Sequence, residues 1–445
     1  MAKTNISGWG NFPRTKAEVE RPDSENEVRS LQQSVGTHIP RGAGRSYGDS
    51  ALSSTILESA KLNETLDFDS ENGIFTCRSG KMLNMILDEI VPKGFFLPVT
   101  PGTKFITVGG AIAADIHGKN HHVDGCFSQH VLWFNLMTAD GSIRKCSRTE
   151  NTELFWATCG GMGLTGFILE ASFQLKGIET SKIINRTIKC SNLDEVISKL
   201  LEHESYTYSV AWIDCAISGE NLGRSLLYLG EHATKVEVAD DDLTPYKTPS
   251  PLFGLPFNLP NWTLNRWTVK AFNALYYGKV LQKDGTAIVG FGPYFYPLDI
   301  ADNWNRLYGS NGFAQYQFVI PMDGAHEGMN RIMQEIVKSG ESSFLAVLKL
   351  FGEQNEGWLS FPKRGLQLAL DFPINEKSLV LMNRLDDMVM KMNGRSYLAK
   401  DSRMKRAFFE ASYPKLAQFK QLLSEIDPNV KFRSLQSDRL GITPN

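Results

Sequence analysis

The stretch TPGTKFITVGGAIAADIHGKNHHVDGCFSQH, residues 100–130, concentrates the features that decide the fold and the site. Gly102, Gly109, Gly110 and Gly118 supply positions without a Cβ. At such positions the backbone can closely approach a bulky planar or phosphorylated ligand. The polar groups that follow the apolar run within eight residues are Asp115, His117, Lys119, Asn120, His121 and His122. The stretch therefore predicts a ligand surface followed directly by hydrogen-bonding and proton-transfer groups.

Length and composition limit the classes of protein to consider. A chain of 445 residues is too long for one ordinary core, so we expect two domains. With 42% hydrophobic and 22% charged residues and no low-complexity tract, the composition is that of a folded protein. The formal net charge of -2 argues against nucleic acid as the main partner, because such a partner requires a large basic face.

The N-terminal residues and the cysteines indicate a cytoplasmic protein. Residues 1–16 lack the apolar core of a secretory signal, and no run approaches 18 apolar residues. The cysteines are scattered without a CxxC pair, which favours free thiols in a reducing compartment. They are Cys77, Cys126, Cys146, Cys159, Cys190 and Cys215.

A second glycine-rich loop, PRGAGRSYGDSA, occupies residues 40–51. Arginines interleaved with glycines describe a tight loop whose amides and guanidinium groups could wrap a diphosphate. The spacing is neither GxGxxG nor GxxxxGK[ST], so neither a nicotinamide Rossmann fold nor a P-loop is indicated. Taken alone, the loop is equally well explained as a glycine-rich surface turn.

Local patterns predict the elements around these loops. A capping-box arrangement, SENE at residues 24–27, predicts a short helix over residues 28–33. A strand over residues 73–77 precedes a helix over 81–91, whose apolar positions have core spacing. A strand over residues 130–138 leads to a hairpin turn at Asp140-Gly141, and a further glycine cluster lies in residues 154–169.

The residue pattern changes near Gly177, where the glycine-rich loops end. Strand-like runs then alternate with amphipathic helices at residues 193–201, 327–337 and 376–392, the last ending at Gly394. A final helix contains Leu416, Phe419 and Leu423 and stops at Asp427-Pro428. Five prolines in residues 244–262 exclude a regular element and favour a lid or surface arm over an ordered irregular loop.

Three separated motifs together resemble a known cofactor-binding family. PRGAGRSYGD, PGTKFITVGGAIAADIHGKN and LFWATCGGMGLTG, in that order and at those distances, resemble the FAD-binding domain of the vanillyl-alcohol-oxidase type, also called the p-cresol-methylhydroxylase type. DIHGKNHH, YFYPLD, QYQFVIP, LKLFG, LDFPI and YLAKDSR more specifically resemble the decaprenylphosphoryl-β-D-ribose oxidase family, the flavin subunits of a 2′-epimerase in cell-wall arabinan synthesis.

The resemblance implies an α+β fold in two parts. Residues 1–176 would form an FAD-binding domain completed by residues 396–445, and residues 177–395 a substrate-binding domain with an antiparallel sheet covered by helices. The loop of residues 40–51 lacks the histidine or cysteine with which relatives attach the flavin, so the resemblance implies non-covalent FAD. The implied cofactor-binding residues are Pro40, Arg41, Gly42, Ala43, Gly44, Arg45, Ser46, Tyr47, Gly48, Asp49, Ser50, Gly102, Thr107, Val108, Gly109, Gly110, Ala114, Asp115, Ile116, His117, Ile168 and Tyr397.

The resemblance also implies an activity, the oxidation of a polyprenylphosphoryl pentose at C2 to the 2-keto sugar. Such a reaction passes a hydride to the flavin and the hydroxyl proton to a base. The implied catalytic residues are His117 and Lys400, with Lys119, Lys349 or Lys400 as partners of the lipid phosphate. The implied substrate-binding residues are Tyr47, Lys119, Tyr296, Gln315, Gln317, Lys349 and Asp371. The implied partners are a short-chain NAD(P)H-dependent ketoreductase and the membrane surface.

Simpler interpretations exist for several of these residues. His117 could be a structural hydrogen-bonding group, and Lys349 and Lys400 lie in strand-like runs where lysine is usually at an edge or in solvent. The histidines and Cys126 fit no usual zinc spacing, so we expect no metal. We expect Trp9, Trp156 and Trp212 to be core aromatics. Mycobacterial members carry a cysteine where this chain has Ala369, which argues against thiol-directed inhibition. An aldonolactone or alditol oxidase and a non-catalytic flavoprotein scaffold remain alternatives.

Overall fold

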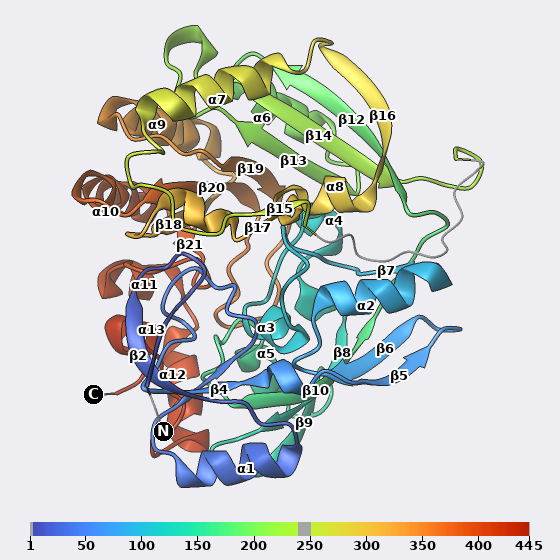
Figure 1. Cartoon of the computed structure of the whole chain (residues 1–445), viewed down its shortest axis with the longest axis vertical. Helices are drawn as coiled ribbons and strands as arrows, with labels where there is room; N and C mark the ends of the chain where they lie inside the picture. Colours follow the sequence, from blue (N-terminus) through green and yellow to red (C-terminus); the bar gives the residue numbers. More distant parts are fainter. Residues whose placement is uncertain (1–2, 239–250, 445) are drawn as a thin grey trace.

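The computed structural model describes residues 3–238 and 251–444, and these form two parts stacked along the long axis of the molecule (Figure 1). The lower part contains both termini, and the upper part is built on an eight-stranded sheet (Figure 1). The C-terminal helices return to the lower part and lie beside the N-terminal strands. They are α11 (Arg406–Ser412), α12 (Leu416–Ile426) and α13 (Leu435–Leu440).

Two sheets form the lower part. One has the order β1 (Thr4–Ser7), β2 (Arg14–Glu20), β4 (Thr55–Glu58), β3 (Ile39–Arg41). The other has the order β5 (Thr65–Asp69), β6 (Ile74–Arg78), β10 (Phe167–Gln174), β8 (Val131–Met137), β9 (Ile143–Ser147). The short strands β7 (Phe95–Phe96) and β11 (Lys176–Gly177) pair with each other. The helices here are α1 (Glu25–Ser34), α2 (Leu83–Ile90), α3 (Val108–Ala113), α4 (His121–Asp124) and α5 (Thr152–Thr158).

The local predictions for this part are confirmed, with small shifts of the boundaries. Helix α1 is capped by Ser24, whose side chain accepts from the backbone N–H of Glu27, but it starts three residues earlier than expected. The apolar side of α2 is fully buried. Strands β8 and β9 form the expected hairpin, whose turn needs Gly141 because its φ is +82°.

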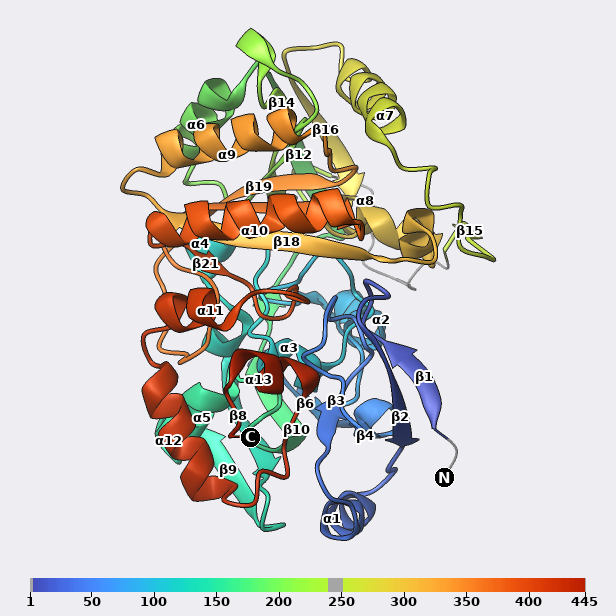
Figure 2. The ribbon, with the colours of Figure 1, turned by 90° about the vertical axis from the view of Figure 1, so that its left-hand side faces the viewer.

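The upper sheet is antiparallel throughout. Its order is β16 (Asp284–Gly290), β12 (Lys182–Cys190), β14 (Ser225–His232), β13 (Tyr208–Ile213), β19 (Ala346–Phe351), β20 (Gly365–Pro373), β18 (Phe313–Pro321), β21 (Arg395–Ser396). Helices α6 (Leu193–Glu202), α9 (Ala325–Ser339) and α10 (Glu376–Lys391) lie side by side over one face (Figure 2). The α+β fold with a helix-covered antiparallel sheet is therefore confirmed.

Strand alternation gives this sheet two chemically different faces. Successive side chains of a strand point to opposite faces, so Tyr316 and Phe318 of β18 enter the core beneath the helices. Gln315 and Gln317, which alternate with them along β18, face the lower part of the molecule and line a cavity. In β20, Leu368 likewise lies in the core. The polar face of the sheet thus becomes one wall of the cavity.

Several expectations need correction. Lys349 lies in β19, which is paired on both sides, and Lys400 lies in a turn, so neither is at a strand edge. After α10 the chain turns at Asn393, with φ +53°, rather than at Gly394. Of the proline-rich segment, residues 244–250 lie outside the described residues. Downstream, β15 (Phe253–Gly254) pairs in parallel with β17 (Ala301–Asp302), and α7 (Arg266–Gly278) and α8 (Phe291–Phe295) follow β15 and precede β17.

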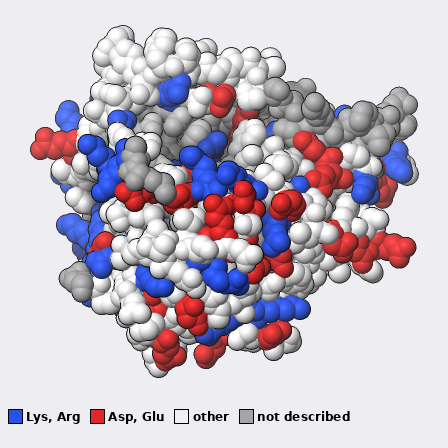
Figure 3. Space-filling view, turned by 60° about the horizontal axis from the view of Figure 1, so that its bottom comes forward, with Lys and Arg blue, Asp and Glu red and all other residues white. Residues whose placement is uncertain are grey.

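The charge distribution on the surface and the state of the cysteines agree with the expectations from composition. Acidic and basic side chains are interspersed on the face shown in Figure 3, as expected from their nearly equal numbers. All six cysteines are free and buried, as predicted. Within residues 3–238 and 251–444, no helix is long and apolar enough to cross a membrane.

Candidate active site

A cavity of about 710 Å³ lies between the two parts of the molecule. This volume is in the range of small-molecule and cofactor sites, roughly 300 to 1,000 Å³. The lower part contributes the loop of residues 40–51 and residues from 100–119 and 158–168. The upper part contributes the polar face of its sheet, and the C-terminal segment contributes Tyr397, Ala399 and Lys400. The glycine-rich stretches thus meet the sheet in one place.

The loop of residues 40–51 is held in shape by Arg41. Its guanidinium group donates to the carbonyls of Ser7 (2.7 Å) and Ala51 (3.2 Å). Gly44 has φ +65°, and a Cβ there would lie 2.3 Å from the Arg41 guanidinium. A Cβ on Gly42 would lie 2.1 Å from Thr107 Oγ1, so the loop can pack against α3 only through glycine. The sequence therefore dictates a close approach of two backbone segments at the cavity wall.

His117 lies at the centre of the cavity wall and is nearly inaccessible to solvent. The side-chain amide N–H of Gln317 donates to His117 Nε2 over 2.9 Å. Because Nε2 accepts this bond, the ring proton is assigned to Nδ1, which has no hydrogen-bond partner among the described residues. Burial, assisted by Lys349, His121 and Lys400, holds the pKa of His117 well below its usual value. The imidazole is therefore a neutral hydrogen-bond donor toward the cavity.

Lys119, Lys349 and Lys400 line the same cavity as His117. Lys400 Nζ lies 3.7 Å from the ring centroid of Tyr47, and burial lowers its pKa to about 7 against the opposing effect of Asp371. Lys349 Nζ donates to the carbonyl of Gly118 (3.4 Å), and burial lowers its pKa to about 8. Lys119 donates to the carbonyl of Tyr294, and burial lowers its pKa to about 7. The site combines a high density of amines with little compensating negative charge.

Two of the expected substrate-binding residues do not line the cavity. Asp371 lies behind Gln315, whose amide donates to its carboxylate over 2.6 Å, and burial raises the pKa of Asp371 to about 7. The hydroxyl of Tyr296 is bonded to Thr100 Oγ1 over 2.7 Å. The expected residues that do line the cavity are Tyr47, Lys119, Gln315, Gln317, Lys349, His117 and Lys400.

Four of the expected cofactor-binding residues also lie behind the wall: Gly48, Asp49, Val108 and Asp115. Asp115 accepts from Ser360 Oγ (2.5 Å) and Asn355 Nδ2 (2.7 Å), so it joins the lower part to the loop after β19. A Cβ on Gly48 would lie 1.8 Å from the carbonyl oxygen of Asp401, which fixes the loop against the turn that carries Lys400. Eighteen of the twenty-two expected residues line the cavity, and these four support it.

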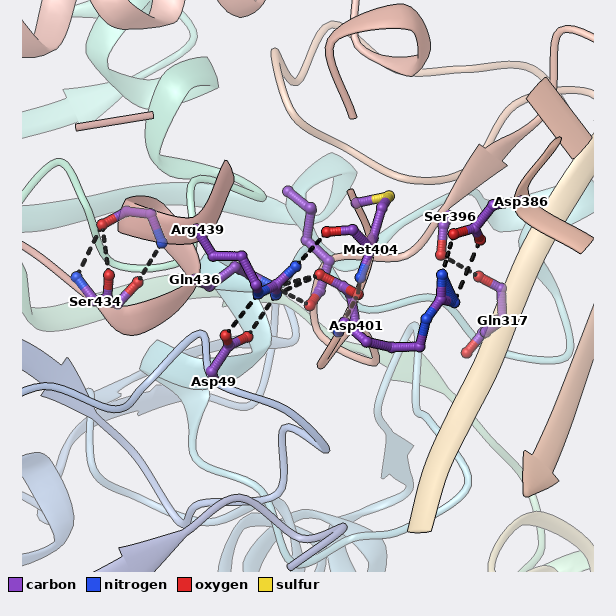
Figure 4. A network of polar contacts seen from close by, with 12 residues as sticks. Asp49, Gln317, Asp386, Ser396, Asp401, Met404, Ser434, Gln436 and Arg439 are labelled. Carbon is purple, nitrogen blue, oxygen red and sulfur yellow. Dashed lines mark hydrogen bonds and ion pairs between the residues drawn. The ribbon is translucent and has the colours of Figure 1, made fainter. Parts of the chain in front are cut away.

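An ion-pair network connects the loop to that turn (Figure 4). The Arg439 guanidinium donates to both Asp49 oxygens (2.8 and 2.9 Å) and to Asp401 Oδ2 (2.7 Å). Arg439 lies in α13, Asp49 in the glycine-rich loop, and Asp401 directly after Lys400. Close by, Arg403 pairs with Asp386 of α10. The C-terminal segment is therefore fixed to both walls of the site.

The remaining histidines of residues 100–130 have structural partners. His121 Nδ1 accepts from the backbone N–H of Gly352 (3.1 Å), and the rings of His122 and His130 bond to backbone carbonyls. Among the described residues no group of three or more His, Cys, Asp or Glu side chains is arranged to hold a metal ion.

Sequence reasoning missed several cavity residues. The Gln367 side chain is fully buried, lines the cavity and has both polar atoms without a partner in the described structure. Ser79 Oγ is likewise buried and unpartnered beside Gly109. Trp212, expected in the core, lines the cavity, as does Trp9, which packs under Arg45. Strand alternation was the available signal, because Gln367 and Ala369 occupy the positions of β20 opposite Val319 and Gln317.

The cavity fits a flavin nucleotide. Its lower wall has glycine-rich backbone. Residues that line the cavity also hold buried polar atoms without a partner among the described residues, namely Ser79 Oγ, His117 Nδ1 and the Gln367 amide. Buried polar atoms without partners cost free energy, so a ligand that pairs with them is stabilised.

Comparison with known proteins agrees with this fit. A family described as "FAD binding domain" matches residues 17–147. The chain is 37% identical to decaprenylphosphoryl-β-D-ribose oxidase of Mycolicibacterium smegmatis over 98% of this chain and 97% of that protein. It is 31% identical to an uncharacterised protein of Streptomyces coelicolor, over 81% of this chain and all of that protein. L-gulonolactone oxidase of Mus musculus is 28% identical over 41% of this chain and 42% of that protein.

Fold, cavity and relatives together define an FAD-dependent oxidoreductase. Within that class, the extent of the similarity decides the family, because it covers nearly the whole of both chains. The chain belongs to the decaprenylphosphoryl-β-D-ribose oxidase family.

Proposed function

We propose that this enzyme oxidises a polyprenylphosphoryl pentose, such as decaprenylphosphoryl-β-D-ribose, at C2 to the 2-keto sugar, the first half of a 2′-epimerisation in cell-wall arabinan synthesis. The observation that carries the proposal is the convergence of Lys119, Lys349 and Lys400 on one cavity beside the His117 donor. Such a cluster of amines suits an anionic sugar lipid, which would compensate the enclosed positive charge. The M. smegmatis relative bears the name of an oxidase of this type.

The proposed roles follow from the protonation states. When bound, FAD supplies the acceptor for the carbinol hydride. Lys400, with its pKa lowered to about 7, is neutral often enough near neutral pH to accept the hydroxyl proton of the sugar. His117 Nδ1 donates a hydrogen bond that orients the reacting sugar, and Gln317 holds the ring in place. Lys119 and Lys349 bind the phosphate, and Gln315 and Tyr47 complete the pocket.

The proposal also covers the cofactor, the domains and the partners of the enzyme. FAD is held non-covalently, because the loop of residues 40–51 contains neither histidine nor cysteine. The chain divides into an FAD-binding domain of residues 1–176 and 396–445 and a substrate-binding domain of residues 177–395, with the cavity between them. A short-chain NAD(P)H-dependent ketoreductase reduces the keto sugar, and the protein takes its lipid from a membrane surface.

An anaerobic titration tests the proposal. The yellow protein is mixed with a polyprenylphosphoryl ribose, and bleaching of the flavin absorbance is followed by stopped flow. We expect bleaching by this substrate, and we expect Lys400→Met and His117→Ala to lower its rate by about 100-fold or more. Bleaching by free aldonolactones or alditols instead would favour the alternative oxidase, and a bound flavin that no sugar reduces would favour the non-catalytic scaffold.

A further inference from the structure

Helix α7 and its flanks carry an unusual share of the exposed apolar surface. Of the fifteen large hydrophobic side chains exposed among the described residues, eight lie within residues 251–288, less than a tenth of the chain. Isolated exposed hydrophobic residues are normal, but a concentration of this kind marks a contact surface. The eight are Leu252, Phe253, Phe257, Trp262, Trp267, Leu275, Leu281 and Ile288.

Helix α7 is apolar on two sides. Its inner side packs through Phe272 and Tyr276 against Phe344 and Trp212 of the upper part, at ring-centroid distances of 4.5 and 4.8 Å. Its outer side carries Trp267 and Leu275, which are separated by about 80° around the helix axis. Of these two residues, 74% and 76% are exposed. An ordinary surface helix turns a polar face to water.

The charges along this segment have one sign. Residues 251–283 contain four Lys or Arg and no Asp or Glu. Lys283 pairs with Glu195, while Arg266 lies against Trp267 and Lys279 against Tyr276. Arg266 and Lys270 are one turn apart and exposed, and Lys270 lies about 60° from Trp267 around the helix axis, on the side away from Leu275. Tryptophan and leucine flanked by lysine and arginine are typical of helices that lie in the interface of an anionic membrane.

The same helix is part of the cavity wall. Phe272, Tyr276 and Lys279 of α7 line the cavity, together with Val210 and Trp212 of β13. Figure 2 shows α7 standing apart from α6, α9 and α10, which cover the other face of the sheet. An apolar chain that enters along α7 therefore reaches the lysines at the cavity centre without crossing the helix-covered core.

We infer that α7, with Trp262 before it and Leu281 after it, is a docking surface for an anionic phospholipid bilayer. Trp262, Trp267 and Leu275 enter the acyl boundary, and Arg266 and Lys270 pair with lipid phosphates. The biological role of this docking, which is to bring the cavity mouth to a polyprenyl lipid, rests on the proposed function. The binding itself is a property of the surface.

Vesicle flotation of the FAD-loaded enzyme tests the inference. We expect binding to vesicles of phosphatidylcholine with phosphatidylglycerol, and weaker binding to phosphatidylcholine alone. In Trp267→Ala/Leu275→Ala the partition coefficient should fall by about tenfold or more, since two large side chains leave the acyl boundary. The matched control is Leu201→Ala/Val380→Ala, which removes exposed apolar side chains from α6 and α10 and should bind as the parent does.

Other results would overturn the inference. These are absence of binding to anionic vesicles, equal binding by Trp267→Ala/Leu275→Ala, and a lipid-free dimer in the parent that this variant loses. Arg266→Gln/Lys270→Gln should lose the preference for anionic vesicles. Flavin reduction by a short-chain, water-soluble polyprenylphosphoryl ribose should be unchanged in Trp267→Ala/Leu275→Ala. Failure of the parent to reduce with that substrate would contradict the proposed function while leaving vesicle binding unaffected.

Discussion

At the scale of single residues, burial sets the protonation states of Lys400 and His117. Burial lowers the pKa of Lys400 to about 7, because the desolvation of its amine outweighs the opposing effect of Asp371. His117 is neutral near neutral pH, because burial holds its pKa well below the usual value. These protonation states support the proposal that Lys400 accepts the proton near neutral pH and that the His117 imidazole donates a hydrogen bond.

A pH profile follows from this assignment. Below a pKa of about 7 Lys400 is protonated and cannot accept a proton, so the rate of anaerobic flavin reduction should rise with pH and level off above about 8. Lys400→Arg stays protonated and should reduce flavin about 100-fold more slowly at every pH tested. Stopped-flow absorbance from pH 6 to about 9 measures both. A rate that falls with rising pH would contradict the assignment of the base.

Ala369 determines the response to thiol reagents. It lines the cavity opposite Gln317, and none of the six buried cysteines is among the described lining residues. We expect the enzyme to retain its activity with a cavity-directed electrophile, and Ala369→Cys to be inactivated with one equivalent of label. Mass spectrometry of the labelled protein locates the adduct, with Val347→Cys as a second lining position. Rapid inactivation of the parent protein would contradict this prediction.

At the scale of elements, α13 fixes the geometry of the site. Arg439 of α13 bridges Asp49 of the loop of residues 40–51 and Asp401 beside Lys400. Both carboxylates are almost completely buried, and both pair with this one guanidinium group, while Asp401 also accepts from the backbone N–H groups of Arg403 and Met404. The link explains why the C-terminal segment and the first loop, almost 400 residues apart in sequence, form one wall.

Removal of Arg439 should therefore cost stability. Arg439→Ala leaves two buried carboxylates without their cationic partner, and the free energy of unfolding should fall by about 3 to 5 kcal/mol. The matched control is Arg384→Ala, which breaks an exposed pair with Glu335 and should cost less than about 1 kcal/mol. Urea unfolding followed by circular dichroism measures both. FAD affinity should also fall in Arg439→Ala alone, and equal losses in the two variants would refute the role of the bridge.

The whole molecule forms its site between two parts of the fold. The cavity draws one wall from glycine-rich loops and the other from the polar face of an eight-stranded sheet. Because a ligand in the cavity touches both parts, its binding should stabilise the protein as a whole.

The cofactor should therefore be removable and stabilising. Acid or denaturant should release all flavin into the soluble fraction, since FAD is expected to be non-covalent. The apoprotein should melt about 5 °C or more below the reconstituted protein, an increment that grows with FAD concentration. Differential scanning calorimetry with added FAD measures the shift, and riboflavin serves as the control ligand. Flavin that stays with the precipitated chain would contradict the prediction.

The sequence by itself determined the local structure and the class of chemistry. Caps, spacing and turn residues predicted α1, α2 and the β8–β9 hairpin, because these depend on contacts between near neighbours in the chain. The motifs also identified the FAD class, and the packing of Gly42 against the Thr107 side chain and the positive φ of Gly44 account for two of their glycines.

Only the tertiary structure decided which of the predicted site residues line the cavity. Asp115 and Asp371 carry the same chemistry as a site residue, yet hydrogen bonds from partners far along the chain hold both behind the wall. Gln367 carries no motif, and only its place on the cavity face of β20 brings it into the site. The physical reason is that facing and burial arise from pairing of distant strands, and local sequence does not encode which partner a strand will meet.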